Sequence, residues 1–105
     1  MLDYSTNLNL MQKVMDFMYK DDLLDAPVEV VGETQIIGSD SPLDSIVLVV
    51  FLTGIEDELE QAIGKKVRLV LDSIHDFNVA DDRHKFDPYH PTLHADTLVR
   101  YLLTL

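Results

Sequence analysis

The chain of 105 residues contains no cysteine. It therefore cannot form a disulfide, offer a thiolate nucleophile or build a cysteine-based zinc or iron–sulfur site. Any thiol chemistry must come from a prosthetic group. Basic residues are also scarce, because 8 Lys and Arg stand against 19 Asp and Glu, for a net charge of −11. This shortage argues against nucleic acid as a partner, since neutralising phosphates requires clustered Lys and Arg.

Long hydrophobic runs are missing as well. No stretch reaches the length needed to span a bilayer, and the first five residues lack the basic and apolar regions of a signal peptide. We therefore expect a cytoplasmic protein without a membrane span. The length and the 47% hydrophobic fraction predict one domain, residues 1–105, with a packed core. The acidic surface either steers the protein to basic partners or only keeps it in solution.

The first predicted element is an amphipathic helix over residues 7–20. Its apolar residues recur at three- and four-residue steps, and Asn7 or Asn9 can cap it. A methionine stripe at this spacing is typical of a core, although it also suits an adaptable binding surface. The following residues, 23–41, carry several Gly and Pro breakers and predict a long connection.

The β-branched run at residues 46–52 fits either a buried strand or a buried helix. Ser41 and Asp44 supply cap oxygens before it and strong helix formers follow it, which favours a helix over residues 45–59. The expected core face of that helix comprises Ile46, Val49, Leu52, Ile55 and Leu59. Gly54 within it either leaves room for a ligand cavity or permits close helix packing.

Gly64 is expected to end this helix. Residues 67–71 then form a short extended piece or lead into a short helix, for which Asp72 or Ser73 is a candidate cap. A last helix beginning near residue 92 or 94 should bury one face, consisting of Leu98, Tyr101, Leu102 and Leu105.

The chain shows no enzyme signature. Ser45 lies in no Gly-x-Ser-x-Gly elbow, and no Gly-rich phosphate loop is present. The four histidines form no His-Glu-x-x-His set, and Pro91 separates His90 from His94. We therefore expect no metal site and interpret these side chains as solvated loop histidines, namely His75, His84, His90 and His94.

A polar turn at residues 38–44 leads a serine directly into the predicted second helix. Asp44, Ser45 and Ile46 resemble the Asp-Ser-Leu attachment motif of acyl carrier proteins, and residues 97–102 resemble the closing helix of that family. The resemblance implies an all-α fold: a small four-helix bundle with a long loop between helices 1 and 2 and an extended segment before the last helix.

In that family a phosphopantetheinyl transferase moves 4′-phosphopantetheine from coenzyme A onto the serine, here Ser45. Asp44 would cap the helix or bind the magnesium ion of the transferase, and Ile46 would complete the motif. The resemblance thus implies a monomeric carrier, not an enzyme, that presents thioesters to acyl-activating and acyl-transferring enzymes of fatty acid, lipid or polyketide biosynthesis. Aminoacyl and peptidyl carriers share the same arrangement of helices and attachment serine.

The chain departs from the family after the serine. Positions usually acidic there are Val47 and Val50, and acid begins only with residues such as Glu56 and Glu58. We expect these four side chains to contact partners, and we expect residues 75–91 to pack over Val47, Val50 and Phe51. A short acyl chain could be sheltered in the predicted core, consisting of Met15, Met18, Ile46, Val49, Leu52, Ile55, Leu98 and Leu102.

Two other interpretations stay open. An unmodified helical module could use the apolar second helix to bind a partner. Alternatively, strands at residues 46–52 and 67–71 would make a small α/β domain in which Ser45 is only a turn residue.

Overall fold

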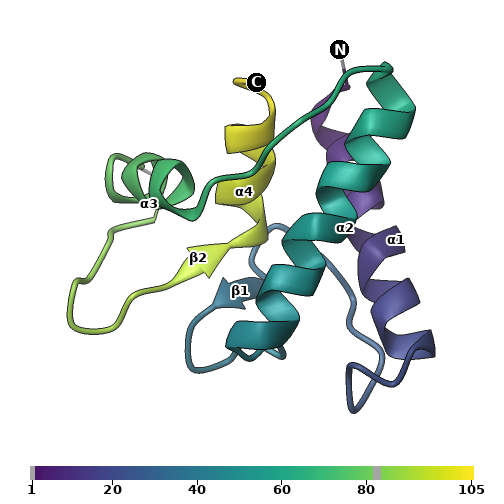
Figure 1. Ribbon diagram of the computed structural model, residues 1–105. Coiled ribbons are helices and arrows are strands. Elements are labelled where there is room, and N and C mark those ends of the chain that lie inside the picture. The colour runs from purple at the N-terminus through teal and green to yellow at the C-terminus, as the bar shows by residue number, and fades with distance from the viewer. Residues whose placement is uncertain (1, 82–83) are drawn as a thin grey trace.

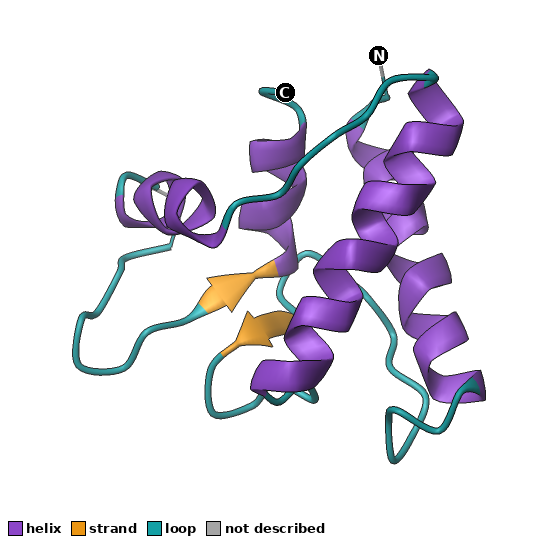
Figure 2. Cartoon of the chain, in the orientation of Figure 1, coloured by secondary structure: helices purple, strands orange, loops and turns teal. Residues whose placement is uncertain are grey.

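The chain folds mainly into helices, as a computed structural model that describes residues 2–81 and 84–105 shows (Figure 1). The elements, in order, are α1 (Tyr4–Lys20), β1 (Gln35–Ile37), α2 (Ser45–Ile63), α3 (Leu71–Val79), β2 (Leu93–His94) and α4 (Ala95–Leu102). Figure 2 shows how little of this is strand. The all-α class is confirmed, together with a small strand pair that was not predicted.

Helix α1 begins earlier than the sequence predicted. Its cap is Asp3, whose carboxylate accepts a hydrogen bond from the Thr6 N–H at 2.8 Å, and neither Asn7 nor Asn9 caps it. Asn7 instead lies one turn inside the helix, where it is buried. The C-terminal end matches the prediction, since the chain turns away at Asp22, which has a positive φ of 62°.

Residues 46–52 are helical and form part of α2, so the strand alternative for them is wrong. The Asp44 carboxylate caps this helix by accepting the Val47 N–H at 2.8 Å, and Gly64 ends it with a left-handed φ of 69°. The helix is longer than the predicted 45–59. Gly54 allows close packing on α1, because a Cβ atom there would lie 2.7 Å from Cγ1 of Val14.

The predicted buried face of α2 is only partly correct. Leu52, Ile55 and Leu59 are buried, but Ile46 is 79% exposed and Val49 is 54% exposed, so neither belongs to the core. Nearly every residue from 46 to 52 is apolar, and several helical faces therefore fit the same pattern. The face that packs inward contains Phe51, which is fully buried.

The strand alternative at residues 67–71 is wrong. These residues form no strand, and α3 begins at Leu71 without a side-chain cap, so neither Asp72 nor Ser73 caps it.

Strands β1 and β2 pair antiparallel with an irregular register, in which Gln35 faces His94 and Ile37 faces Leu93. This pair ties the long α1–α2 connection to the start of α4.

The core lies between α1, α2 and α4, with α3 packed on α4 (Figure 1). Leu98, Tyr101 and Leu102 are buried as predicted, but Leu105 is 48% exposed because α4 has already ended at Leu102. Within the described residues, no helix is long and apolar enough to cross a membrane.

The predicted packing of residues 75–91 over α2 is wrong. Residues 75–79 belong to α3, and the loop that follows runs to β2 on the side away from α2 (Figure 1). Phe86 of this loop packs edge-on against His75, with 5.3 Å between ring centroids, and Val50 remains 39% exposed. Asp82 and Arg83 of this segment lie outside the described residues.

Candidate functional site

Ser41 stabilises the turn that precedes α2. Ser41 Oγ donates a hydrogen bond to the Ile36 carbonyl oxygen at 2.6 Å and accepts one from the Leu43 N–H at 3.1 Å. The Ser41 N–H also bonds the carbonyl oxygen of Gly38, which has a φ of 142° that favours glycine. Ser41 therefore fixes the path of the chain into α2.

Ser45 is placed differently. It is the first residue of α2 and is exposed to solvent. Within residues 2–81 and 84–105, its hydroxyl has no hydrogen-bond partner in the protein. The helix cap fixes its backbone, because Asp44 accepts from the Val47 N–H through its side chain and from the Leu48 N–H through its carbonyl oxygen, each at 2.8 Å. The structure thus combines a fixed position with an accessible hydroxyl.

The backbone at this position offers free hydrogen-bond donors to a phosphate. The first N–H groups of a helix have no partner within it, and Asp44 satisfies only those of Val47 and Leu48. The N–H groups of Ser45 and Ile46 stay available at the positive end of the helix dipole. A phosphodiester on Ser45 Oγ would lie beside these donors.

An apolar surface begins one residue after the serine. The exposed apolar side chains in the N-terminal half of α2 are Ile46 at 79%, Val49 at 54% and Val50 at 39% exposure. Val47, one of the predicted partner contacts, is half-buried and packs against the core. Of the predicted valine contacts, Val50 is thus the more accessible.

The two predicted acidic partner contacts already have partners within the chain. Glu56 accepts a hydrogen bond from the Leu69 N–H at 2.7 Å, which fixes the segment between α2 and α3. Glu58 pairs with Lys13 of α1 at 3.0 Å. Both carboxylates therefore help to hold the fold together around α2.

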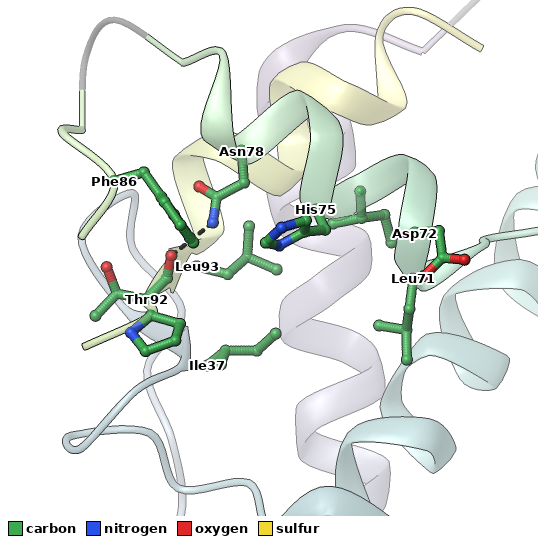
Figure 3. Close-up of a pocket in the computed structure, with 10 residues that line it drawn as sticks. Ile37, Leu71, Asp72, His75, Asn78, Phe86, Thr92 and Leu93 are labelled. Atoms are coloured by element: carbon green, nitrogen blue, oxygen red, sulfur yellow. Dashed lines mark hydrogen bonds between the residues drawn. The ribbon is translucent and has the colours of Figure 1, made fainter. Parts of the chain in front are cut away.

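A cavity of about 230 Å³ lies between α3 and the strand pair, and sequence reasoning did not find it. Figure 3 shows Ile37, His75 and Leu93 pointing toward it, with Phe86 at one side. Asn78 also lines the cavity and donates a hydrogen bond to the Thr92 carbonyl oxygen at 2.6 Å (Figure 3). The predicted shelter between α1, α2 and α4 is filled instead, since Met15, Ile55 and Leu98 are fully buried.

Two of the four histidines are not solvated loop residues. His84 and His94 stack with ring centroids 4.1 Å apart, and His84 lies 3.4 Å from the Asp96 carboxylate. Burial and the neighbouring His84 lower the pKa of His94, while Asp81, Asp96 and Glu33 oppose that shift. Among the described residues, no group of three or more His, Cys, Asp or Glu is arranged to hold a metal ion.

An ion pair lies next to this histidine pair, because Asp96 contacts both His84 and Arg100. Asp81, whose side chain is 1% exposed, receives two hydrogen bonds from the Arg100 guanidinium at 2.6 and 2.9 Å and one from Thr97 at 2.7 Å. Arg100 also contacts Asp96, and these carboxylates raise its pKa above the ordinary value. The network fastens the loop after α3 to α4.

No family model, curated protein or solved structure matches this chain.

Proposed function

We propose that this chain is an acyl carrier protein that bears 4′-phosphopantetheine on Ser45. One observation carries the proposal: the Ser45 hydroxyl is exposed and unbonded at the first position of a capped helix, while the nearby Ser41 is fully engaged. The Asp44-Ser45-Ile46 sequence and the order of the four helices support the same function.

The proposed modification joins Ser45 Oγ to the phosphorus of the phosphopantetheine group. The diphosphate bond of coenzyme A breaks, the nucleotide part leaves, and the serine proton passes to a base of the transferase. One oxygen of Asp44 is occupied by the Val47 N–H, so the other can bind the magnesium ion of the transferase. The arm then supplies the thiol that this cysteine-free chain lacks.

The proposed partners are a phosphopantetheinyl transferase and the acyl-activating and acyl-transferring enzymes that follow it. They would contact Ile46, Val49 and Val50, since these apolar side chains lie beside the attachment point and are accessible. The net charge of −11 would favour partners with a basic rim around that contact. A monomeric, cytoplasmic carrier fits this role.

The size of the cavity between α3 and the strand pair suits a small cargo. At about 230 Å³ it is below the size usual for drug-like ligands, about 300–1,000 Å³. Its largely apolar wall, with Ile37, Leu71, Ile74 and Leu93, suits a short acyl chain. An aminoacyl group or a peptidyl group would use the same arm.

Intact mass measured after incubation with coenzyme A and a broad-specificity transferase tests the proposal. The wild-type chain should gain a single phosphopantetheine group, Ser45→Ala should gain none, and Ser41→Ala should still gain one. If several transferases leave the folded wild-type chain unmodified, the carrier function is contradicted.

One observation favours a second candidate, an unmodified helical interaction module. Ile46, Val49 and Val50 form an exposed apolar face that could bind a partner without any arm. In that case the chain would acquire no adduct, and Ile46→Asp would abolish partner binding while Ser45→Ala left it unchanged.

A further inference from the structure

A groove lies on the surface between α1 and α2. The two helices run side by side in opposite directions (Figure 1), and the groove has a volume of about 250 Å³. Its floor is the contact of Val14 with Gly54, a residue that adds no side chain to the surface of α2. The volume is below that of sites for drug-sized ligands, about 300–1,000 Å³, and suits side chains of a docked segment.

The walls of the groove carry exposed apolar side chains from three segments. Phe17 of α1 is 51% exposed, and Leu23 and Val50 are each 39% exposed. Apolar side chains that gather on one surface, rather than lying singly, mark a site of interaction. From Val50 the groove follows α2 as far as Gln61, away from Ser45.

The lining positions follow one face of each helix. They recur at three- and four-residue steps, as 50, 54, 57, 58 and 61 on α2 and as 14, 17, 18 and 21 on α1. A rise of 1.5 Å per residue makes the stripe on α2 about 16 Å long. Two such rows side by side form a channel into which a third helix can lay its apolar face.

The charged residues that line this groove are all acidic. They are Asp21, Asp57 and Glu58, and no Lys or Arg of the described residues joins them. Lys13 pairs with Glu58 at 3.0 Å. In the part of the chain that the structure describes, the carboxylates of Asp21 and Asp57 have no ion-pair or hydrogen-bond partner. Two unpaired carboxylates beside an apolar channel complement a partner with positive charge.

We propose that this groove binds an amphipathic helix of a basic partner protein. The apolar face of that helix would contact Phe17, Leu23 and Val50, and its Lys or Arg side chains would pair with Asp21 and Asp57. A second copy of this chain suits the groove poorly, because two molecules with a net charge of −11 repel each other. The proposal does not depend on modification of Ser45 and would hold for an unmodified chain.

The experiment is an NMR titration of the intact, unmodified chain with a capped lysine–leucine peptide that forms an amphipathic helix. About 14 residues are enough to cover the groove. The dissociation constant should be about 10–100 μM, because the peptide must order on binding. Backbone amide shifts should saturate around Phe17, Leu23, Gly54 and Asp57.

Two peptides serve as ligand controls. A glutamate–leucine peptide keeps the apolar face but reverses the charge, and a lysine–alanine peptide keeps the charge but lacks the large apolar side chains. Each should bind at least about tenfold more weakly than the lysine–leucine peptide, since the groove needs both features.

Two pairs of variants locate the contact. Asp57→Lys should weaken binding of the lysine–leucine peptide by about five- to tenfold. Glu60→Lys makes the same change in net charge at an exposed position of α2 outside the groove, and it should weaken binding by less than about twofold. Phe17→Ala should weaken binding by about fivefold or more, whereas Tyr19→Ala, which is 41% exposed outside the groove, should not.

The proposal is overturned if either control peptide binds as tightly as the lysine–leucine peptide, or if the shifts map outside the groove. Equal losses in Asp57→Lys and Glu60→Lys would also overturn it, because attraction to the overall negative charge would then explain the binding. The same holds if dilution of the chain alone moves these amides and sedimentation shows a dimer, since a second copy would then occupy the groove. All four substituted side chains are exposed, so the fold should persist, and circular dichroism checks it.

Discussion

At the scale of single residues, the two serines before and at the start of α2 have different tasks. The Ser41 hydroxyl makes two hydrogen bonds that hold the turn, whereas Ser45 projects a free hydroxyl from a capped helix. Proximity in sequence thus does not make them equivalent. The distinction depends on the fold of the turn, because both serines follow an aspartate in the sequence.

Ser41→Ala should lower the free energy of unfolding by about 1–2 kcal/mol, since the Leu43 N–H and the Ile36 carbonyl oxygen lose their shared partner. Ser45→Ala should change it by less than about 0.5 kcal/mol, as for other exposed positions. Urea denaturation of the unmodified chains measures both. Equal losses in the two variants would contradict the roles assigned to these serines.

Gly54 is a residue-scale test of the contact between α1 and α2. An added Cβ would lie 2.7 Å from Cγ1 of Val14, which is buried, so Gly54→Ala should destabilise by about 1–2 kcal/mol although alanine is the better helix former. Val14→Ala removes the obstructing methyl groups. In the double variant, measured by thermal and urea denaturation, the cost of Gly54→Ala should therefore vanish, and purely additive effects would argue against this contact.

At the scale of elements, the last helix is held by polar contacts as well as by its apolar face. Arg100 of α4 binds Asp81 through two nitrogens, and the Asp81 side chain is almost fully buried. Removing one member of a buried ion pair leaves an uncompensated charge, which is costly. This pair therefore matters more for stability than the exposed Lys13–Glu58 pair between α1 and α2.

Arg100→Gln should lower the free energy of unfolding by about 3 kcal/mol because Asp81 stays buried without its guanidinium partner. Lys13→Gln is the surface comparison and should cost less than about 1 kcal/mol. Chemical denaturation followed by circular dichroism gives both values. A cost of Arg100→Gln no larger than that of Lys13→Gln would show that the pair does not fasten the loop to α4.

The sequence predicted the elements better than it predicted which faces they bury. Gly64 and Asp44 set the ends of α2 through a left-handed turn and a carboxylate cap, and both signals were readable. Ile46 and Val49 were assigned to the core wrongly, because an apolar run of this length does not select one face. Long-range packing made that choice, as the close approach of Val14 of α1 to Gly54 of α2 shows.

The strand pair and the cavity below α3 could not be predicted for a similar reason. β1 and β2 contain few residues and pair across more than 50 positions of sequence, so neither gives a clear alternation. The Asp81–Arg100 pair and the stacked histidines likewise join segments that only the fold brings together. Residue types were enough to propose Ser45 as an attachment site, whereas these contacts needed the structure.

At the scale of the whole molecule, His94 couples stability to pH. Burial and repulsion from His84 lower the pKa of His94 in the folded state. Below a pH of about 6.5 the unfolded state therefore binds more protons than the folded state. The stability that neutral His94 contributes is fully present above that pH, and it is lost as the pH falls toward the lowered pKa of the folded state. Protonation of His94 should weaken its stacking on His84.

The denaturant midpoint should therefore fall between about pH 7.5 and pH 5.5, the range in which histidine titrates. His94→Gln should reduce this fall because the half-buried titrating group is gone, whereas His90→Gln, at an exposed position, should not. Denaturation curves at the two pH values measure the effect. If His94→Gln and the wild type lose stability equally, carboxylates account for the pH dependence instead.

The most direct test of the central claim is a titration of thiols in the folded protein after reaction with coenzyme A and a phosphopantetheinyl transferase. The chain has no cysteine, so every protein-bound thiol must belong to an attached arm. The wild type and Ser41→Ala should each show one thiol per chain, and Ser45→Ala should show none. A wild-type chain that gains no thiol, or a Ser45→Ala chain that gains one, would contradict Ser45 as the attachment site.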